Sequence, residues 1–121
     1  FKQVHQMIST VESKIKSNLS SSEIIKHTFP MGSMTGAPKV KAMNIIEDLE
    51  VSARGLYSGA LGYIKPSGDF DFNVVIRSLI YDTNTKYLSF HVGSAITSKS
   101  KILNEYNECL LKAEAMISVL K

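Results

Sequence analysis

Three charged side chains near the end of the sequence have the spacing of a small ion-binding site. Glu105, Glu108 and Lys112 follow the pattern i, i+3, i+7, which places them on one stripe of a helix. Apolar residues border this stripe, and charges among apolar groups are costly unless they are paired or bind a metal. Two carboxylates suit Mg²⁺, which keeps several waters and adds ligand oxygens. The alternative, favoured by spacing alone, is a solvated face with a Glu108–Lys112 ion pair.

Arg77 is a candidate for binding a carboxylate. The alternation of residues 70–77 predicts a strand with Arg77 on the same face as Asp71, Asn73 and Val75. A guanidinium group offers planar, bidentate recognition of a carboxylate. The alternative is an arginine paired with Asp71 on a solvent-facing sheet surface, and spacing does not decide between the two.

Residues 29–39 form a glycine-punctuated loop that leads into an amphipathic helix. Pro38 suits the first helical position, so Thr35, Gly36 and Ala37 are expected at the helix N-terminus. Free N–H groups and the helix dipole there favour an anion such as a carboxylate or a phosphate. A plain loop with a well-formed helix start is the alternative.

Four motifs span residues 29–43, 54–63, 72–78 and 105–108, the last followed by Lys112. Together and in this order they resemble motifs of the chorismate-utilising enzymes, the family of anthranilate synthase component I, aminodeoxychorismate synthase component I, isochorismate synthase and salicylate synthase. Family members are much longer, and this chain resembles only their C-terminal part. The resemblance therefore implies that residues 1–121 are the C-terminal segment of a single chorismate-binding domain.

The resemblance implies roles for most of the candidate residues. Glu108 is expected to bind Mg²⁺ directly and Glu105 to bind it directly or through a water, with the ion bridging to the ring carboxylate of the substrate. Arg77 is expected to hold the enolpyruvyl carboxylate, with help from Tyr57. Further carboxylate contacts are implied for Lys112 and for the amides around Thr35, Gly36 and Gly93. His5 resembles a family histidine that faces the substrate ring, where a proton donor or acceptor beside a departing hydroxyl is chemically sensible.

One departure from the family pattern lies beside Gly93. Family members commonly have three glycines, whereas Ser94 and Ala95 follow Gly93 here. Any conformation that requires a positive φ would be strained at these positions, so Gly93 is the better candidate for an amide contact. His27 and His91 match no family element and are interpreted as structural.

The implied reaction is Mg²⁺-assisted replacement of the C4 hydroxyl of chorismate. Residues 56–59, Leu-Tyr-Ser-Gly, look more like aminodeoxychorismate synthase, which makes 4-amino-4-deoxychorismate for folate biosynthesis, than like anthranilate synthase. Anthranilate synthase and isochorismate or salicylate synthase remain alternatives. A glutamine amidotransferase subunit is the implied ammonia donor. A hypothesis from another class is a non-catalytic fragment or binding module with half a pocket, prone to form homodimers.

Composition limits the partners. The chain has 121 residues, is 44% hydrophobic and carries a formal charge of +3 with scattered lysines, which disfavours a nucleic-acid surface. Cys109 is the only cysteine, so an intramolecular disulfide is excluded and a reducing cytoplasm is the simplest location. No apolar run approaches the length of a membrane span.

Local patterns predict the elements that position these residues. Ser20 and Glu23 form a capping box that starts a helix to about residue 28, and a second helix is expected over residues 37–50. The apolar spacing of residues 1–16 allows either a helix or a strand, and the family resemblance implies a strand. Further strands are expected over residues 57–64, 70–77 and 87–97, with turns at residues 65–69 and 82–85. The last helix has an apolar stripe expected to be buried, formed by Leu103, Tyr106, Leu110, Ala113, Ile117 and Leu120. The fold class is α+β, an antiparallel sheet with helices packed on one face.

Overall fold

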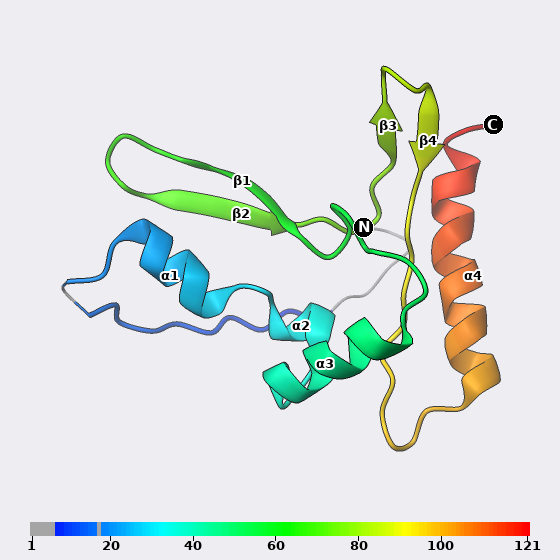
Figure 1. Cartoon of the computed structure of the whole chain (residues 1–121), viewed down its shortest axis with the longest axis horizontal. Helices are drawn as coiled ribbons and strands as arrows, with labels where there is room; N and C mark the ends of the chain where they lie inside the picture. Colours follow the sequence, from blue (N-terminus) through cyan, green and yellow to red (C-terminus); the bar gives the residue numbers. More distant parts are fainter. Residues whose placement is uncertain (1–6, 17) are drawn as a thin grey trace.

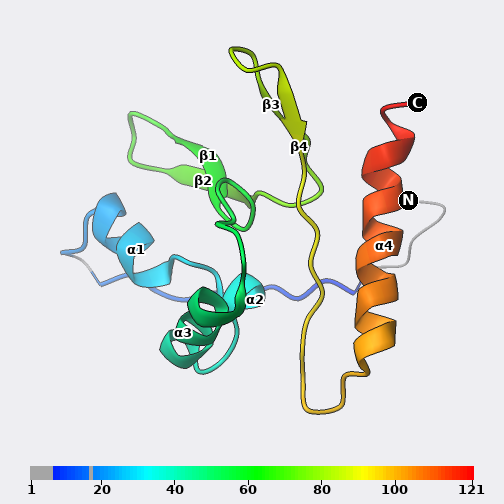
Figure 2. The same ribbon diagram turned by 45° about the vertical axis from the view of Figure 1, so that its right-hand side comes forward.

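The computed structural model describes residues 7–16 and 18–121 as a mixture of helices and short antiparallel strands (Figure 1). In chain order the elements are α1 (Ser21–Thr28), α2 (Gly32–Thr35), α3 (Lys39–Leu49), β1 (Ala60–Ile64), β2 (Phe70–Val74), β3 (Ile80–Asp82), β4 (Tyr87–Ser89) and α4 (Ile102–Ser118). The segment that follows β4 runs alongside α4 in both views (Figures 1 and 2). The expected mixture of helices and antiparallel strands is confirmed.

The first helix begins as its sequence predicts. The Glu23 amide donates to Ser20 Oγ at 3.4 Å, and the Ser20 amide donates to a Glu23 carboxylate oxygen at 2.8 Å. This reciprocal capping satisfies two of the N–H groups that a helix start leaves unpaired. The helix ends at Thr28, two residues before Pro30. The capping box is thus confirmed.

The second expected helix starts later than predicted. Pro38 is the N-cap of α3, with an extended ψ of 136°, and Lys39 is the first helical residue. The prediction that Pro38 occupies the first helical position is therefore wrong. A single helical turn, α2, lies within the expected loop and ends at Thr35.

Hairpins form at both predicted turns, but the second one uses β3, where no strand was expected. In the first, β1 pairs with β2 so that Gly62 lies opposite Phe72, and the Lys65 amide donates to the Asp69 carbonyl at 2.7 Å across the turn. In the second, β3 pairs with β4, and the Asn84 amide donates to the Asp82 carboxylate at 2.8 Å. Turn residues that accept local hydrogen bonds explain why these connections were readable in the sequence.

Gly62 is required by the first hairpin because β2 approaches its backbone closely. A Cβ on Gly62 would overlap the Asp71 carbonyl oxygen and would lie 2.6 Å from Phe72 Cδ1. We expect Gly62→Ala to destabilise the hairpin by about 2 kcal/mol, as overpacked positions do. Gly32→Ala is the matched control, because a Cβ there meets no atom within 4 Å. Amide exchange across β1 and β2 measures the effect; equal protection in both variants would contradict this account.

The expected single sheet with helices on one face is wrong. The strands form two separate two-stranded sheets, β1–β2 and β3–β4. The strands expected over residues 57–64, 70–77 and 87–97 are shorter, and residues 7–16 contain no strand. A strand needs a partner for its backbone groups, and within the described part of the chain residues 7–16 have no strand partner. Beyond the paired residues of β1 and β2, the Ser58 amide still donates to the Val75 carbonyl and the Val75 amide to the Gly59 carbonyl, both at 2.9 Å. The rest of the strand expected over residues 1–16 lies outside the description.

The chain exposes far more surface than a compact domain. Its accessible surface is 10857 Å², whereas a compact monomer of 13.4 kDa exposes roughly 6,500 Å². Among the described residues only Met116 and Ser58 are buried, and the predicted burial of the α4 stripe is wrong, since Leu103 is 69% exposed. A periodic apolar stripe shows which face of a helix can be buried. The described residues do not include a surface that covers the stripe of α4.

Candidate functional site

An open cavity of about 1190 Å³ collects most of the candidate residues. Its walls come from α2 and the residues after it, α3, the turn before β1, residues 91–97 and one face of α4. The predicted site residues that line it are Thr35, Gly36, Tyr57, Arg77, Gly93, Glu108 and Lys112. His5 lies outside the described residues. Segments distant in the sequence therefore converge on one cavity.

Side chains of α4 bind the neighbouring extended segment. Lys112 Nζ donates to the Gly93 carbonyl at 2.8 Å and pairs with Glu108 Oε1 at 2.6 Å. Ser94 Oγ donates to the Glu105 carboxylate, which places Glu105 beside the cavity although it is not part of the lining. The Glu108–Lys112 ion pair, which the alternative interpretation of this stripe as a solvated face predicts, is present. Lys112 also connects α4 to Gly93.

The charge of Lys112 acts directly on Glu108. The hydrogen bond from Lys112, followed by its positive charge, lowers the pKa of the Glu108 carboxyl below its ordinary value. Glu108 is 49% exposed and Lys112 is 31% exposed, so solvent screens the pair. Glu108 is therefore an ionised carboxylate at neutral pH, at the edge of the cavity.

Glu105 and Glu108 fit a hard cation in the chemistry of their donors. Both are carboxylates, they lie on successive turns of α4, and Mg²⁺ is commonly bound by one or two carboxylates together with waters and ligand oxygens. Over residues 7–16 and 18–121, no cluster of three or more His, Cys, Asp or Glu side chains could enclose a metal. Two carboxylates alone would leave the other coordination positions of such an ion to waters and ligand oxygens.

Tyr57, His91 and Gly93 form one contiguous wall. The rings of Tyr57 and His91 stack with centroids 5.6 Å apart and an interplanar angle of 21°. A Cβ on Gly93 would lie 2.8 Å from the Tyr57 hydroxyl oxygen, so a larger residue at position 93 would displace this hydroxyl. The buried His91 Nδ1 has no hydrogen-bond partner among the described residues. Sequence spacing gave no signal that His91, interpreted as structural, would line the cavity.

The loop residues lie in the cavity but not at the expected helix terminus. Thr35 is the last residue of α2, and its hydroxyl donates to the Met31 carbonyl at 3.1 Å. Gly36 follows with a φ of 136°, a conformation that favours glycine. Because α3 begins only at Lys39, the predicted placement of Thr35 and Gly36 at its N-terminus is wrong.

Arg77 is exposed, lines the cavity and lies beyond the end of β2. The expectation that it shares a strand face with Asp71 is wrong, because the strand ends at Val74. The ion pairs of the described chain are Arg54–Glu50 and Lys112–Glu108, so the alternative pairing with Asp71 is not formed there. Arg77 has a φ of 49°, which is uncommon for a residue with a side chain.

Ser94 and Ala95 adopt no strained backbone. The residues other than glycine with positive φ in the described chain are Ser58, Arg77 and Lys86. Replacement of the usual glycines at positions 94 and 95 is therefore compatible with the local backbone. Ser94 adds a hydroxyl that binds Glu105, a contact that glycine could not make.

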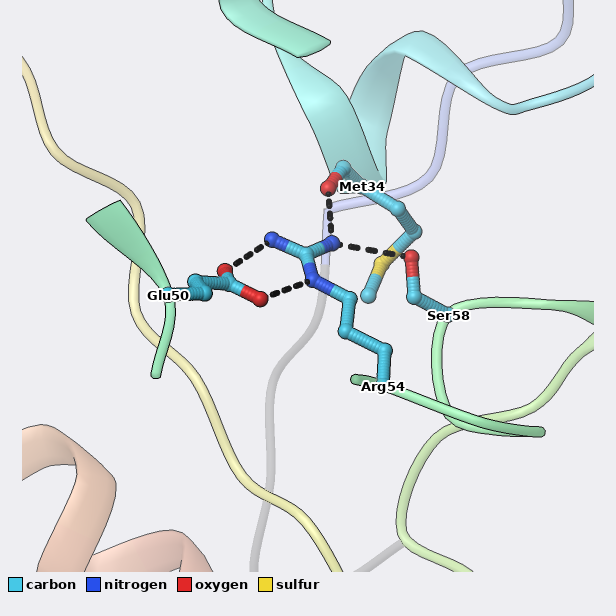
Figure 3. Close-up of polar contacts among 4 residues, drawn as sticks. All are labelled: Met34, Glu50, Arg54 and Ser58. Carbon is cyan, nitrogen blue, oxygen red and sulfur yellow. Dashed lines mark hydrogen bonds and ion pairs between the residues drawn. The ribbon is translucent and has the colours of Figure 1, made fainter. Parts of the chain in front are cut away.

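Sequence reasoning missed Arg54, which forms the best-connected polar cluster of the described chain (Figure 3). Its Nε and Nη2 donate to the two carboxylate oxygens of Glu50 at 2.8 and 2.5 Å. Its Nη1 donates to the Met34 carbonyl at 2.8 Å and to Ser58 Oγ at 3.1 Å. The bond to Glu50 raises the pKa of Arg54 and lowers the pKa of Glu50. The sequence signals were the i, i+4 spacing of residues 50 and 54, which is common on surfaces, and the position of Arg54 at the start of the motif over residues 54–63, neither of which indicated this cluster.

Within the described residues, no helix combines the length and the apolar character needed to cross a membrane.

Comparison with known proteins gives consistent matches over nearly the whole chain. The family described as chorismate binding enzyme matches residues 1–118. The "Probable aminodeoxychorismate synthase, chloroplastic" of Oryza sativa subsp. japonica is 44% identical over 121 residues, which are 100% of this chain and 13% of the rice protein. The aminodeoxychorismate synthase of Streptomyces pristinaespiralis is 41% identical over 118 residues, 98% of this chain and 16% of that protein.

Anthranilate synthase component 1 of Acinetobacter calcoaceticus is also similar, with 31% identity over 121 residues, 100% of this chain and 24% of that protein. The chain therefore spans between 13% and 24% of the length of these three relatives.

Proposed function

Because the chain belongs to the chorismate binding enzyme family, we propose that its cavity binds chorismate as part of an aminodeoxychorismate synthase. That enzyme replaces the C4 hydroxyl of chorismate with an amino group from ammonia, giving 4-amino-4-deoxychorismate. The observation that carries the proposal is the convergence of the family's motif residues on one cavity. Identities of 44% and 41% to two aminodeoxychorismate synthases, against 31% and 37% to the anthranilate synthase component 1 of Acinetobacter calcoaceticus and of Neisseria meningitidis, support the choice of reaction.

Cationic and hydrogen-bonding groups of the cavity suit a dicarboxylate. Arg77 has an exposed guanidinium, which we propose holds the enolpyruvyl carboxylate together with the Tyr57 hydroxyl. Lys112 and the amides around Gly36 and Gly93 are proposed to contact the carboxylates from the facing walls. Preorganised donors of this kind stabilise negative charge that develops as the hydroxyl departs.

Glu105 and Glu108 are the residues that would hold Mg²⁺. When bound, the ion would supply positive charge that holds and polarises the dianionic substrate. Ser94 orients Glu105 and Lys112 orients Glu108, so both carboxylates are positioned before a ligand arrives. His5, outside the described residues, is proposed as the proton donor or acceptor beside the departing hydroxyl.

We propose that further protein surface completes the site. The accessible surface exceeds that of a compact domain of this mass by thousands of Å², and much of it is apolar. A chain that exposes so much apolar surface is expected to be inactive alone. The proposed ammonia donor is a glutamine amidotransferase subunit. The same observation favours a second candidate, a non-catalytic binding module with half a pocket that forms homodimers.

A chimera tests the proposal. This chain replaces the matching 118-residue segment of the Streptomyces pristinaespiralis aminodeoxychorismate synthase, to which it is 41% identical. We expect the chimera to form 4-amino-4-deoxychorismate from chorismate, ammonium and Mg²⁺, detected by chromatography. The same exchange is made in the Acinetobacter calcoaceticus anthranilate synthase component 1. That chimera is expected to recover a smaller fraction of the activity of its own unmodified host. A folded chimera that binds chorismate without turnover would support the binding module; equal recovery in both hosts would contradict the assigned reaction.

A further inference from the structure

The side chain of Arg54 links three parts of the chain by hydrogen bonds: the end of α3, helix α2 and the turn before β1. Glu50 is the C-cap of α3, Met34 lies in α2, and Ser58 lies in the turn before β1. A guanidinium has five N–H donors in one rigid plane. Arg54 makes four hydrogen bonds with them, two to Glu50, one to Met34 and one to Ser58 (Figure 3). A lysine ammonium could not reproduce that geometry.

Two of these partners depend on an external contact. Helix α2 has four residues, a length that is not stable on its own, and the carbonyl groups at a helix end lack partners within the helix. Arg54 binds one of them, the Met34 carbonyl. Ser58 is 7% exposed and has a φ of 69°, a strained conformation that persists only where surrounding contacts hold it. Arg54 supplies such a contact to its hydroxyl.

The residues beside these partners belong to the proposed chorismate site. Gly36 is two residues after Met34, and Tyr57 directly precedes Ser58. The Tyr57 amide also donates to the Arg54 carbonyl at 3.1 Å. Because the Tyr57 ring stacks on His91 and its hydroxyl approaches Gly93, a displaced turn would move that hydroxyl along the cavity wall.

We infer that Arg54 is a positioning residue that fixes two walls of the cavity relative to one another. The Gly36 wall is the segment that follows α2, and the Tyr57 wall is formed by Tyr57, His91 and Gly93. The inference rests on the proposed function, because the proposed function assigns these two walls to chorismate binding. Arg54 acts through Met34 and Ser58, and its charge is balanced by Glu50. Arg77, in contrast, is exposed at the cavity and forms no ion pair with the described residues, so the two arginines have different roles.

The test compares Arg54→Lys and Arg54→Ala with the control Lys65→Ala, which removes a cation from an exposed turn. Amide exchange is measured at Met34 and Ser58, whose N–H groups donate to the Met31 and Val75 carbonyls. We expect exchange at both positions to become about tenfold faster in Arg54→Lys, with the β3–β4 hairpin unchanged, because the two walls lose a common link. The dissociation constant for chorismate with Mg²⁺ is expected to rise about tenfold.

Chemical rescue separates positioning from general stability. Ethylguanidinium at millimolar concentration should restore chorismate affinity to Arg54→Ala, whereas ethylammonium should not. If the Arg54 variants do not fold, Ser58→Ala removes one bond of the cluster and should speed exchange at Ser58 and, through the released guanidinium, at Met34.

The outcomes distinguish the inference from the proposed function. Unchanged exchange at Met34 and Ser58 in Arg54→Lys would overturn the inference, and so would an equal loss of affinity in Lys65→Ala. If neither the wild-type chain nor the Streptomyces pristinaespiralis chimera binds chorismate, the proposed function fails. The assignment of the two walls to chorismate then fails with it, while exchange at Met34 and Ser58 still decides whether Arg54 links them.

Discussion

Arg77→Ala is expected to weaken chorismate binding about 100-fold, equivalent to about 2.7 kcal/mol. Arg77 lines the cavity and has no ion pair among the described residues, so its guanidinium is available for a bidentate contact with a carboxylate. Arg77→Lys should recover only part of the affinity, because an ammonium group acts as a point charge. Calorimetric titration with chorismate in the presence of Mg²⁺ measures the loss.

The backbone of Arg77 allows a sharper version of this test. A φ of 49° costs a residue with a side chain about 1 kcal/mol, which glycine avoids. Arg77→Gly should therefore stabilise the fold while it abolishes the carboxylate contact. Lys86 is a matched control, since it has a φ of 59° and lies in the turn between β3 and β4. Equal loss of affinity in Lys86→Gly and Arg77→Gly would show that Arg77 does not bind the substrate directly.

Glu108→Gln is expected to reduce metal affinity by roughly 10- to 100-fold. Glutamine preserves an oxygen that accepts the Lys112 hydrogen bond, so the substitution removes the charge and leaves the local geometry in place. Glu105→Gln should act similarly while it keeps the contact with Ser94. Paramagnetic broadening by Mn²⁺, a probe with the same preference for oxygen ligands, measures binding without any requirement for turnover.

A carboxylate elsewhere on α4 provides the control for this second prediction. Glu114 is exposed on the same helix, outside the stripe of Glu105, Glu108 and Lys112. Glu114→Gln changes the net charge by the same amount and should leave Mn²⁺ broadening unaltered. If Glu114→Gln and Glu108→Gln lower the affinity equally, the metal is attracted by the overall charge of the helix and not by the proposed site.

Features that depend on neighbouring residues were predictable from the sequence. The capping box of Ser20 and Glu23 and both hairpin turns rest on short-range hydrogen bonds, and the structure contains them. The family resemblance also indicated residues that line one cavity, including Tyr57, Gly93 and Lys112. Their roles in binding remain predictions.

Features that depend on distant partners were not predictable. The pattern of residues 70–77 allowed a strand through Arg77, but β2 ends at Val74 where its pairing with β1 ends. The apolar stripe of α4 showed which face could be buried, but not whether a surface would cover it. Arg54 binds residues on both sides of it in the sequence, including Met34 twenty positions away, and no local spacing reports such a cluster.

The most direct test of the central claim, that this cavity binds chorismate with Mg²⁺, is a calorimetric titration of the wild-type chain with chorismate. The titration is carried out with Mg²⁺ and again with the metal removed by chelation. We predict one-to-one binding that depends on Mg²⁺ and is lost in Glu108→Gln. Absence of binding under both conditions, or binding that is unaffected by chelation and by Glu108→Gln, would contradict the claim.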